Sequence, residues 1–332
     1  MLPDRGFLGY NHEDCWKTRK WRHDLNSIWL KSACKFAVAV AFCTGFAQAQ
    51  APEPDGAGLE RGVLPSQWIT GGPDCSVVPK WQVHAYNPDL YILRESGCTN
   101  YEKPFLYLFF GKDRALLQDT GAGETNVAEI VNQTIVEWCR RNGRKSIPLV
   151  VAHSHGHGDH IAGDAQFTGK PNVTVVPLSV EGTQKAYGIR QWPTDPGSID
   201  LGGRVLDVIA IPGHQPFSVA FYDRRTGILL TGDTLYPGRL YVSDFPAFTA
   251  STQRLVDFTH DKPVAHILGC HVEESKTPFL DYPVGTKYQP EEHVLELSHA
   301  HLVELNEALR SMHNHPVRYA LRDFTVWPRE PP

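Results

Sequence analysis

The feature that most constrains this chain is a dense run of histidines with one aspartate, His153-Ser-His-Gly-His-Gly-Asp-His160. It directly follows residues 146–152, a short apolar stretch with β-branched residues that is typical of a buried strand. A loop that begins at the end of a rigid strand can hold side chains in a fixed geometry. Imidazole and carboxylate ligands suit zinc, iron, cobalt or nickel, whereas calcium and magnesium sites are built from oxygen. The run therefore predicts a transition-metal site.

The spacing within the run predicts two neighbouring metal positions. Residues two apart in an extended loop point the same way, so His155 and His157 can bind one ion while Asp159 and His160 face a second. Three further apolar strands end in a residue of ligand type. They are the stretches Ile209–His214, Gly227–Asp233 and Ala265–His271.

This series resembles the metallo-β-lactamase fold superfamily, whose signature is HxHxDH followed by a single His, a single Asp and a last His. The resemblance spans roughly residues 82 to 275. It implies a first metal held by His155, His157 and His214, a second held by Asp159, His160 and His271, and a bridge between them at Asp233. It also implies that Asp119, in the stretch Ala115–Gly121, supports the metal loop from behind the ligands. We expect His153 to be a supporting or structural residue.

The resemblance implies a hydrolase with two Zn²⁺ ions, with iron or manganese as alternatives. Binding to zinc can lower the pKa of a water molecule from about 15.7 to about 7. A hydroxide that bridges two such ions is therefore a nucleophile near neutral pH. The expected reaction is hydrolysis of an ester, thioester, lactone or amide bond in a small-molecule substrate, with Asp159 and Asp233 as catalytic ligands. The stretch Thr231–Leu235 is similar to hydroxyacylglutathione hydrolases, and lactonases share Asp233 with a nearby tyrosine.

Three residues that follow Asp233 are candidates to bind substrate. Tyr236, Arg239 and Tyr241 lie where loops after the metal strands would form the rim of a pocket, and they could orient a carbonyl or a carboxylate. Packing within the loop is the equally weighted alternative.

Three other functions stay open at this point. An exported zinc β-lactamase is the first, although such enzymes usually carry Cys or Ser where this chain has Asp233. A persulfide dioxygenase with a single iron is the second, and it needs fewer ligands than this chain offers. A binding protein whose metals only stabilise the fold is the third, but structural zinc sites are commonly rich in Cys.

The composition is that of an ordinary globular protein. Hydrophobic residues make up 41%, charged residues 21%, and the net charge is −5. Because there is no basic stripe to contact phosphates, we expect no nucleic-acid partner. The oligomeric state is left open.

The N-terminal region predicts export. Lys31 and Lys35 precede an apolar run at 36–46 and a small-x-small site at 47–49, the pattern of a secretory signal peptide cleaved after Ala49. The run is shorter than the roughly 20 residues of a membrane span, so no stable span is expected after processing, and a short membrane anchor is the alternative. We therefore expect a periplasmic or secreted protein.

Four cysteines follow the predicted leader, Cys75, Cys98, Cys139 and Cys270. An exported protein can form disulfides, and Cys75 and Cys98, which flank the first predicted hairpin region, could be joined, although the sequence alone does not fix the connectivity. Cys139 falls within a predicted helix. Cys270 is adjacent to His271, but the resemblance places the metal ligand at the histidine.

The predicted organisation is a leader at 1–49, a linker and N-terminal extension at 50–80, and one domain at 81–332. Strands are expected within 81–95, 105–118 and 172–178, and helices at 125–142, 162–167, 251–260 and about 291–312. Strands interleaved with helices in this order suit an α/β fold. The expected architecture is an αββα sandwich, two mixed β-sheets flanked by helices.

Overall fold

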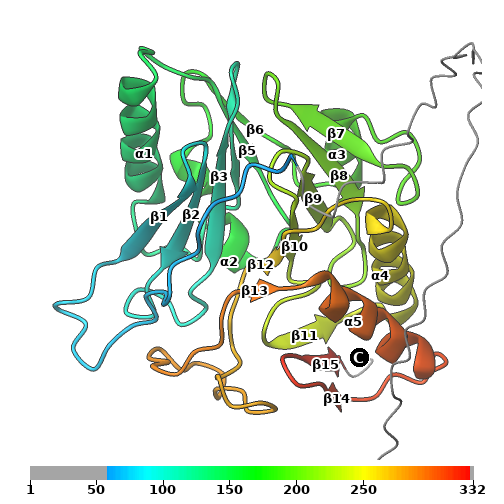
Figure 1. Ribbon diagram of the computed structural model, residues 1–332. Coiled ribbons are helices and arrows are strands. Elements are labelled where there is room, and N and C mark those ends of the chain that lie inside the picture. Colours follow the sequence, from blue (N-terminus) through cyan, green and yellow to red (C-terminus); the bar gives the residue numbers. More distant parts are fainter. Residues whose placement is uncertain (1–57, 330–332) are drawn as a thin grey trace, which may run out of the picture. The chain divides into compact units, whose positions relative to one another are not determined.

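The computed structural model describes residues 58–329, so the predicted signal peptide and its cleavage site lie outside the described residues. Two six-stranded sheets pack face to face, with helices on their outer faces (Figure 1). The expected αββα sandwich is confirmed.

The first sheet has the order β1-β2-β3-β4-β5-β6 and is antiparallel from β1 to β4 and parallel from β4 to β6. Its strands are β1 Trp81–Asn87, β2 Leu90–Glu95, β3 Phe105–Phe110, β4 Ala115–Gln118, β5 Leu149–Ala152 and β6 Val173–Val175. Because β4 and β5 run in parallel, Asp119 and the histidine run follow the same edge of this sheet.

The second sheet has the order β13-β12-β10-β9-β8-β7, in which β10 and β12 are parallel and the other neighbours antiparallel. Its strands are β7 Gly197–Asp200, β8 Val205–Ala210, β9 Val219–Asp223, β10 Ile228–Gly232, β12 His266–Gly269 and β13 Glu296–Leu297. Asp233 directly follows β10, and His271 lies two residues beyond β12 on the parallel neighbour.

The helices are α1 Val127–Arg141, α2 Gly158–Ile161, α3 Val180–Tyr187, α4 Phe245–Thr259 and α5 His299–Ser311, with a short 3-10 helix at Asp164–Gln166. The helix expected at 162–167 is thus replaced by α2 and the 3-10 turn. α4 begins earlier than expected because the Asp244 side chain accepts a hydrogen bond from the Ala247 backbone N–H and caps its first turn.

The alternation of side chains along β3 shows how the layers form. Phe105, Tyr107 and Phe109 are buried between the two sheets, and Leu106 and Leu108 are buried on the opposite face, in the apolar layer that α1 covers. A third apolar layer joins the second sheet to α4 and α5. Each sheet is therefore covered on both faces, as the continuous apolar runs of its strands require.

The C-terminal region differs from the prediction in two ways. The helix expected at about 291–312 begins only at His299, because Glu296–Leu297 pair with β12 as β13 and Ser298 occupies the N-cap position of α5. A small third sheet was not predicted. It has the order β11-β15-β14, with β11 Arg239–Val242, β14 Tyr319–Ala320 and β15 Thr325–Pro328.

The segment before β1 packs against the sandwich from residue 58 on, and Trp68 belongs to the core between the sheets. Cys75 and Cys98 form a disulfide, as the sequence suggested they could. Cys139 is buried in α1. Among residues 58–329, we find no helix that combines the length and the apolar character that crossing a membrane requires.

Candidate functional site

Four strand ends bring the predicted ligands to one place. The run at 153–160 follows β5, His214 follows β8, Asp233 follows β10 and His271 follows β12. Two of the turns require glycine. Gly213 has a φ of 139°, and a Cβ there would lie 2.4 Å from the Phe248 Cα, while Gly232 has a φ of 53° and a Cβ there would lie 2.8 Å from the Ser154 Cβ. The close approach at Gly232 places Asp233 against the run, and the one at Gly213 packs the turn before His214 against Phe248 of α4.

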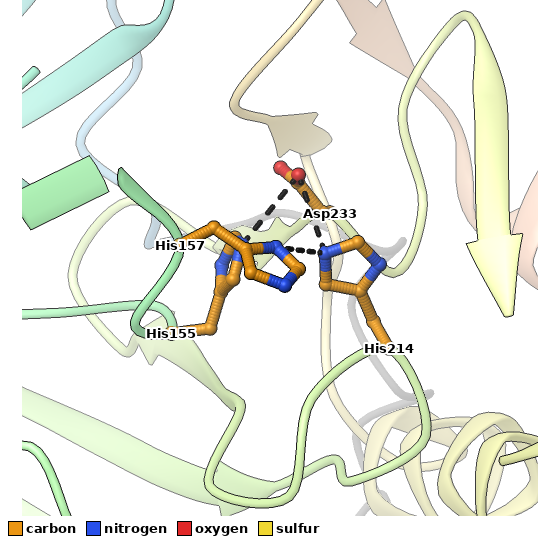
Figure 2. Close-up of side chains that lie close together, drawn as sticks. All are labelled: His155, His157, His214 and Asp233. Carbon is orange, nitrogen blue, oxygen red and sulfur yellow. Dashed lines mark hydrogen bonds and ion pairs between the residues drawn. The ribbon is translucent and has the colours of Figure 1, made fainter. Parts of the chain in front are cut away.

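The first group consists of His155, His157, His214 and Asp233 (Figure 2). The His157 Nδ1 lies 3.1 Å from the His155 Nε2 and 2.9 Å from the His214 Nε2. The Asp233 Oδ2 lies 3.6 Å from the His155 Nε2 and 3.5 Å from the His214 Nε2. The four side chains thus turn one atom each toward a common point.

The second group consists of Asp159, His160, His271 and the same Asp233. The Asp159 Oδ2 lies 3.2 Å from the His160 Nε2 and 3.1 Å from the His271 Nε2, and these two nitrogens are 3.3 Å apart. Asp233 reaches this group with both oxygens, Oδ2 at 3.5 Å from the His160 Nε2 and Oδ1 at 3.5 Å from the His271 Nε2. One carboxylate therefore serves both groups.

These spacings fit tetrahedral coordination. A zinc ion with bonds of about 2.0–2.1 Å holds its ligand atoms about 3.3 Å apart, close to the edges of both groups. The Asp233 Oδ1 is buried and has no hydrogen-bond partner among the described residues. A buried carboxylate oxygen without a donor is costly unless a cation approaches it. The residues present can therefore hold metal ions at both groups.

The second nitrogen of each well-buried imidazole has a partner of its own. The His214 Nδ1 lies 2.8 Å from the Tyr241 carbonyl oxygen, and the His271 Nδ1 lies 2.9 Å from the Glu102 carbonyl oxygen. The His155 Nδ1 lies 3.1 Å from the Ser154 hydroxyl. A hydrogen bond from Nδ1–H to a carbonyl oxygen fixes the tautomer that leaves the Nε2 lone pair free for a metal.

Asp119 supports the run from behind. Its Oδ1 accepts a hydrogen bond from the Ser154 backbone N–H at 2.7 Å, and its Oδ2 lies 3.1 Å from the His160 Nδ1 and 2.8 Å from the Ser154 hydroxyl. The residue is fully buried and has a φ of 66°, an uncommon conformation outside glycine. These contacts fit the supporting position that the sequence predicted for it.

The pKa shifts follow the placement of the carboxylates. Burial lowers the pKa of His155 well below its usual value and that of His214 to about 4, so both imidazoles are in the neutral form that binds metals. Burial also lowers the pKa of His160, but the carboxylates of Asp159, Asp233 and Asp119 outweigh it and raise that pKa well above the usual value. The second group therefore attracts positive charge.

The metallo-beta-lactamase superfamily model matches residues 104–271, about half of the chain, and this span contains all seven residues of the two groups. The chain belongs to the metallo-beta-lactamase superfamily. The confirmed fold and the two groups of side chains agree with this membership.

Several curated proteins are similar to part of this chain. A hydroxyacylglutathione hydrolase of Chelativorans sp. (strain BNC1) is 26% identical over 161 residues, which cover 46% of this chain and 60% of the relative. The acyl-coenzyme A thioesterase MBLAC2 of Bos taurus is 25% identical over 227 residues, which cover 58% of this chain and 81% of the relative. This chain thus spans less than two thirds of the first relative. Among solved structures, a metallo-beta-lactamase from Pontibacter korlensis is 17% identical, with a TM-score of 0.46 over 69% of this chain and 99% of its own.

Two residues adjacent to the predicted ligands have partners of their own. The His153 Nε2 lies 2.8 Å from the Asp164 Oδ1, so this imidazole ties the run to the 3-10 helix. The Cys270 thiol is fully buried and donates a hydrogen bond to the Asp119 Oδ2 at 3.3 Å. Neither side chain is a member of the two four-residue groups.

The three candidate substrate residues have protein partners. The Tyr236 side chain is buried, and its hydroxyl donates a hydrogen bond to the Arg239 carbonyl oxygen. The Arg239 guanidinium forms ion pairs with Glu273 at 2.7 Å and with Asp281, and is 4% exposed. Tyr241 is half-buried and accepts a hydrogen bond from Arg239. The contacts of Arg239 and Tyr236 favour the packing alternative, and substrate binding by these three residues stays a prediction.

Sequence reasoning missed the partners that hold the ligands in place. The sequence does not reveal the roles of the Glu102 and Tyr241 carbonyl oxygens, because every residue has a backbone carbonyl. Ser154 could have been noticed, since a hydroxyl next to the candidate ligand His155 is placed to contact both that ligand and Asp119.

Proposed function

We propose that this protein is a hydrolase with two zinc ions that cleaves a thioester, ester, lactone or amide bond. The observation that carries the proposal is the pair of four-residue groups that share Asp233. In that arrangement His155, His157, His214 and Asp233 would hold one ion, and Asp159, His160, His271 and Asp233 the other. When bound, the two ions would supply a hydroxide nucleophile near neutral pH and Lewis-acid polarisation of the scissile carbonyl.

The side chains themselves define where a substrate can approach. His155, His160, His214 and His271 are buried, whereas the Asp159 side chain is 20% exposed and His157 is half-buried. The open side of the cluster is therefore the side of His157 and Asp159. Burial alone would raise the pKa of Asp159, but the neighbouring imidazoles of His160 and His271 hold it well below its usual range, so its carboxylate is ionised and available as a ligand.

We place thioesters first among the candidate substrates. One relative is named as an acyl-coenzyme A thioesterase and another as a hydroxyacylglutathione hydrolase, names that describe cleavage of acyl groups from thiols. A thiolate is also a better leaving group than an amine, so a nucleophile held by the two groups would meet a lower barrier with a thioester than with an amide.

Metal analysis combined with a substrate panel tests this proposal. We expect two equivalents of zinc in the purified protein by elemental analysis, and hydrolysis of thioesters that is lost on chelation and restored by added Zn²⁺. Parallel assays with a lactone, a simple ester and a cephalosporin would reveal another branch. One equivalent of iron with oxygen consumption on a persulfide would contradict the proposal, as would full metal content without turnover of any substrate.

We further propose that the protein is exported. The Cys75–Cys98 disulfide supports this, because disulfides persist in oxidising compartments. Cell fractionation with mass spectrometry should find the chain outside the cytoplasm and beginning near residue 50. Replacing both cysteines by serine should cost about 3 kcal/mol of unfolding free energy for a loop of this length, measured by urea titration. A reduced Cys75–Cys98 pair in an uncleaved cytoplasmic chain would refute export.

A further inference from the structure

Two neighbouring aromatic rings with an arginine at each end form a row along the small third sheet, and we call it the Arg–aromatic row. It consists of Arg318, Trp327, Tyr241 and Arg329. The Arg318 Cζ lies 3.3 Å from the centre of the Trp327 ring, the Trp327 and Tyr241 rings are 6.1 Å apart, and the Arg329 Cζ lies 5.8 Å from the centre of the Tyr241 ring. Strand pairing between β11 and β15 places Tyr241 directly beside Trp327.

The row begins at the metal cluster. Tyr241 supplies the carbonyl oxygen that lies 2.8 Å from the His214 Nδ1, so its backbone contacts a residue of the first group. Arg329 is fixed at the same end, since its backbone N–H donates a hydrogen bond to the Val242 carbonyl oxygen at 2.9 Å. Arg329 therefore lies next to the strand residue Tyr241, whose carbonyl oxygen contacts His214 of the first group.

The two arginines of the row differ from their neighbours in their lack of acidic partners. Arg239 pairs with Glu273 and Asp281, and Arg322 pairs with Asp323. Arg318 and Arg329 are exposed and form no ion pair with any carboxylate of residues 58–329. A guanidinium that stacks on a ring keeps the N–H groups of its edge free, and that edge matches a carboxylate or phosphate.

We infer that the substrate of this site carries an anionic group, a phosphate or a carboxylate, beyond the scissile bond, and that Arg329 and Arg318 bind it. This rests on the proposed hydrolase function. The aromatic rings of Tyr241 and Trp327 hold the guanidinium groups in place, so that less side-chain freedom is lost on binding. The third sheet, which the sequence did not predict, would thus help to determine which substrates bind.

Matched thioesters test the inference. The same butyryl group is presented on coenzyme A, which carries phosphates, on glutathione, which carries carboxylates, and on N-acetylcysteamine, which is neutral. For the unaltered protein we expect a lower KM for at least one anionic thioester than for the neutral one, and a KM for it that rises with salt. In the Arg318→Ala/Arg329→Ala variant, the KM for that anionic thioester should rise about 10-fold or more, with kcat and the neutral thioester unaffected.

Two controls separate charge from general damage. Arg140→Ala removes an exposed arginine of α1 that pairs with Glu137, and it should leave all three thioesters unchanged. Arg329→Lys keeps the charge but not the planar edge, so it should recover only part of the affinity. Comparing the coenzyme A and glutathione arms identifies which anion the row binds.

Failure of the inference differs from failure of the proposed function. If the neutral thioester is hydrolysed, and the double variant changes neutral and anionic thioesters equally or not at all, the row does not select the substrate. If no thioester is hydrolysed by the zinc-loaded protein, the proposed thioesterase activity fails. Calorimetric binding of S-methyl coenzyme A and S-methylglutathione then still tests the row without turnover, and equal affinity in the unaltered protein and the double variant would overturn it.

Discussion

The two groups that share Asp233 are built with different surroundings. In the first group, the Nδ1 atoms of His155 and His214 contact neutral oxygens, those of the Ser154 hydroxyl and the Tyr241 carbonyl. In the second group, His160 contacts the buried carboxylate of Asp119 in addition to Asp159. This difference places more negative charge around the second position, so the two positions should differ in their affinity for a cation. We expect the second position to hold its cation more tightly, and the first to be the more labile and accessible one.

The largest effect is expected at the residue that the groups share. Asp233→Ala removes a carboxylate from both groups, so both ions should be lost and the rate should fall by more than about 10³-fold, or about 4 kcal/mol in the activation barrier. Elemental analysis after dialysis, together with kcat/KM for a thioester, measures the two effects. Full turnover in this variant would mean that Asp233 is not a ligand.

His157→Ala is the matched comparison for Asp233→Ala. It removes a half-buried ligand atom of the first group only, so one equivalent of metal should remain, in the second group. Circular dichroism should show both variants folded. If His157→Ala instead kept its metal in the first group and lost the second ion, the ranking of the two positions would be reversed.

A smaller effect on metal affinity is expected at Asp119, which supports His160 of the second group. Asp119→Asn keeps the size of the side chain but removes the charge that faces His160, so the affinity for the second ion should fall about 10- to 100-fold while the first ion is little affected. Competition with a chromophoric chelator measures the two affinities separately. Asp164→Asn is the control, because Asp164 contacts His153 and Thr120, which belong to neither group, and should leave both affinities unchanged.

The side chains of both groups could be predicted to lie together because they follow strand ends. An apolar run followed by glycine and histidine, as at 209–214, marks both the strand and the turn, and the order of the motifs indicated the sandwich. The supporting position of Asp119 was implied by the resemblance to the superfamily. Sequence motifs therefore predict the parts of a site in which side chains of one chemical type follow a strand within a few residues.

The third sheet was not predictable for the opposite reason. β14 and β15 are short, and β15 pairs with β11, more than eighty residues earlier in the chain. Nothing local in residues 317–329 indicates that pairing, because the partner strand lies on the far side of α4 and α5 in sequence. The same distance explains why the sequence predicted no role for Arg318 and Arg329. Residues 291–298 were wrongly predicted as helix because β13 forms only where β12 is available to pair with it.

The smallest effect concerns a carboxyl group on the side of the second group. Glu95 is fully buried, and its Oε2 accepts a hydrogen bond from the Ala122 backbone N–H while its Oε1 has no partner among the described residues. Burial raises its pKa from 4.5 to about 7, with further contributions from the negative charge of Glu124 and, to a smaller extent, from that of Asp159. The folded protein therefore favours the protonated form, and unfolding releases that proton between about pH 4.5 and pH 7.

Stability contributed by the neutral Glu95 is complete below about pH 4.5 and is lost as the pH rises through about 7. Glu95→Gln keeps the hydrogen bond without the charge, so it should stabilise the metal-free protein by about 2 kcal/mol at pH 8 and have little effect at pH 4.5. Urea titrations of both proteins at the two pH values measure the difference. Because a cation in the second group would neutralise Asp159, loading with Zn²⁺ should lower the pKa of Glu95 and shrink the gain at pH 8. A gain that is the same with and without zinc would show that the negative charge of the second group does not extend to Glu95, and would confine the contrast between the two groups to their immediate partners.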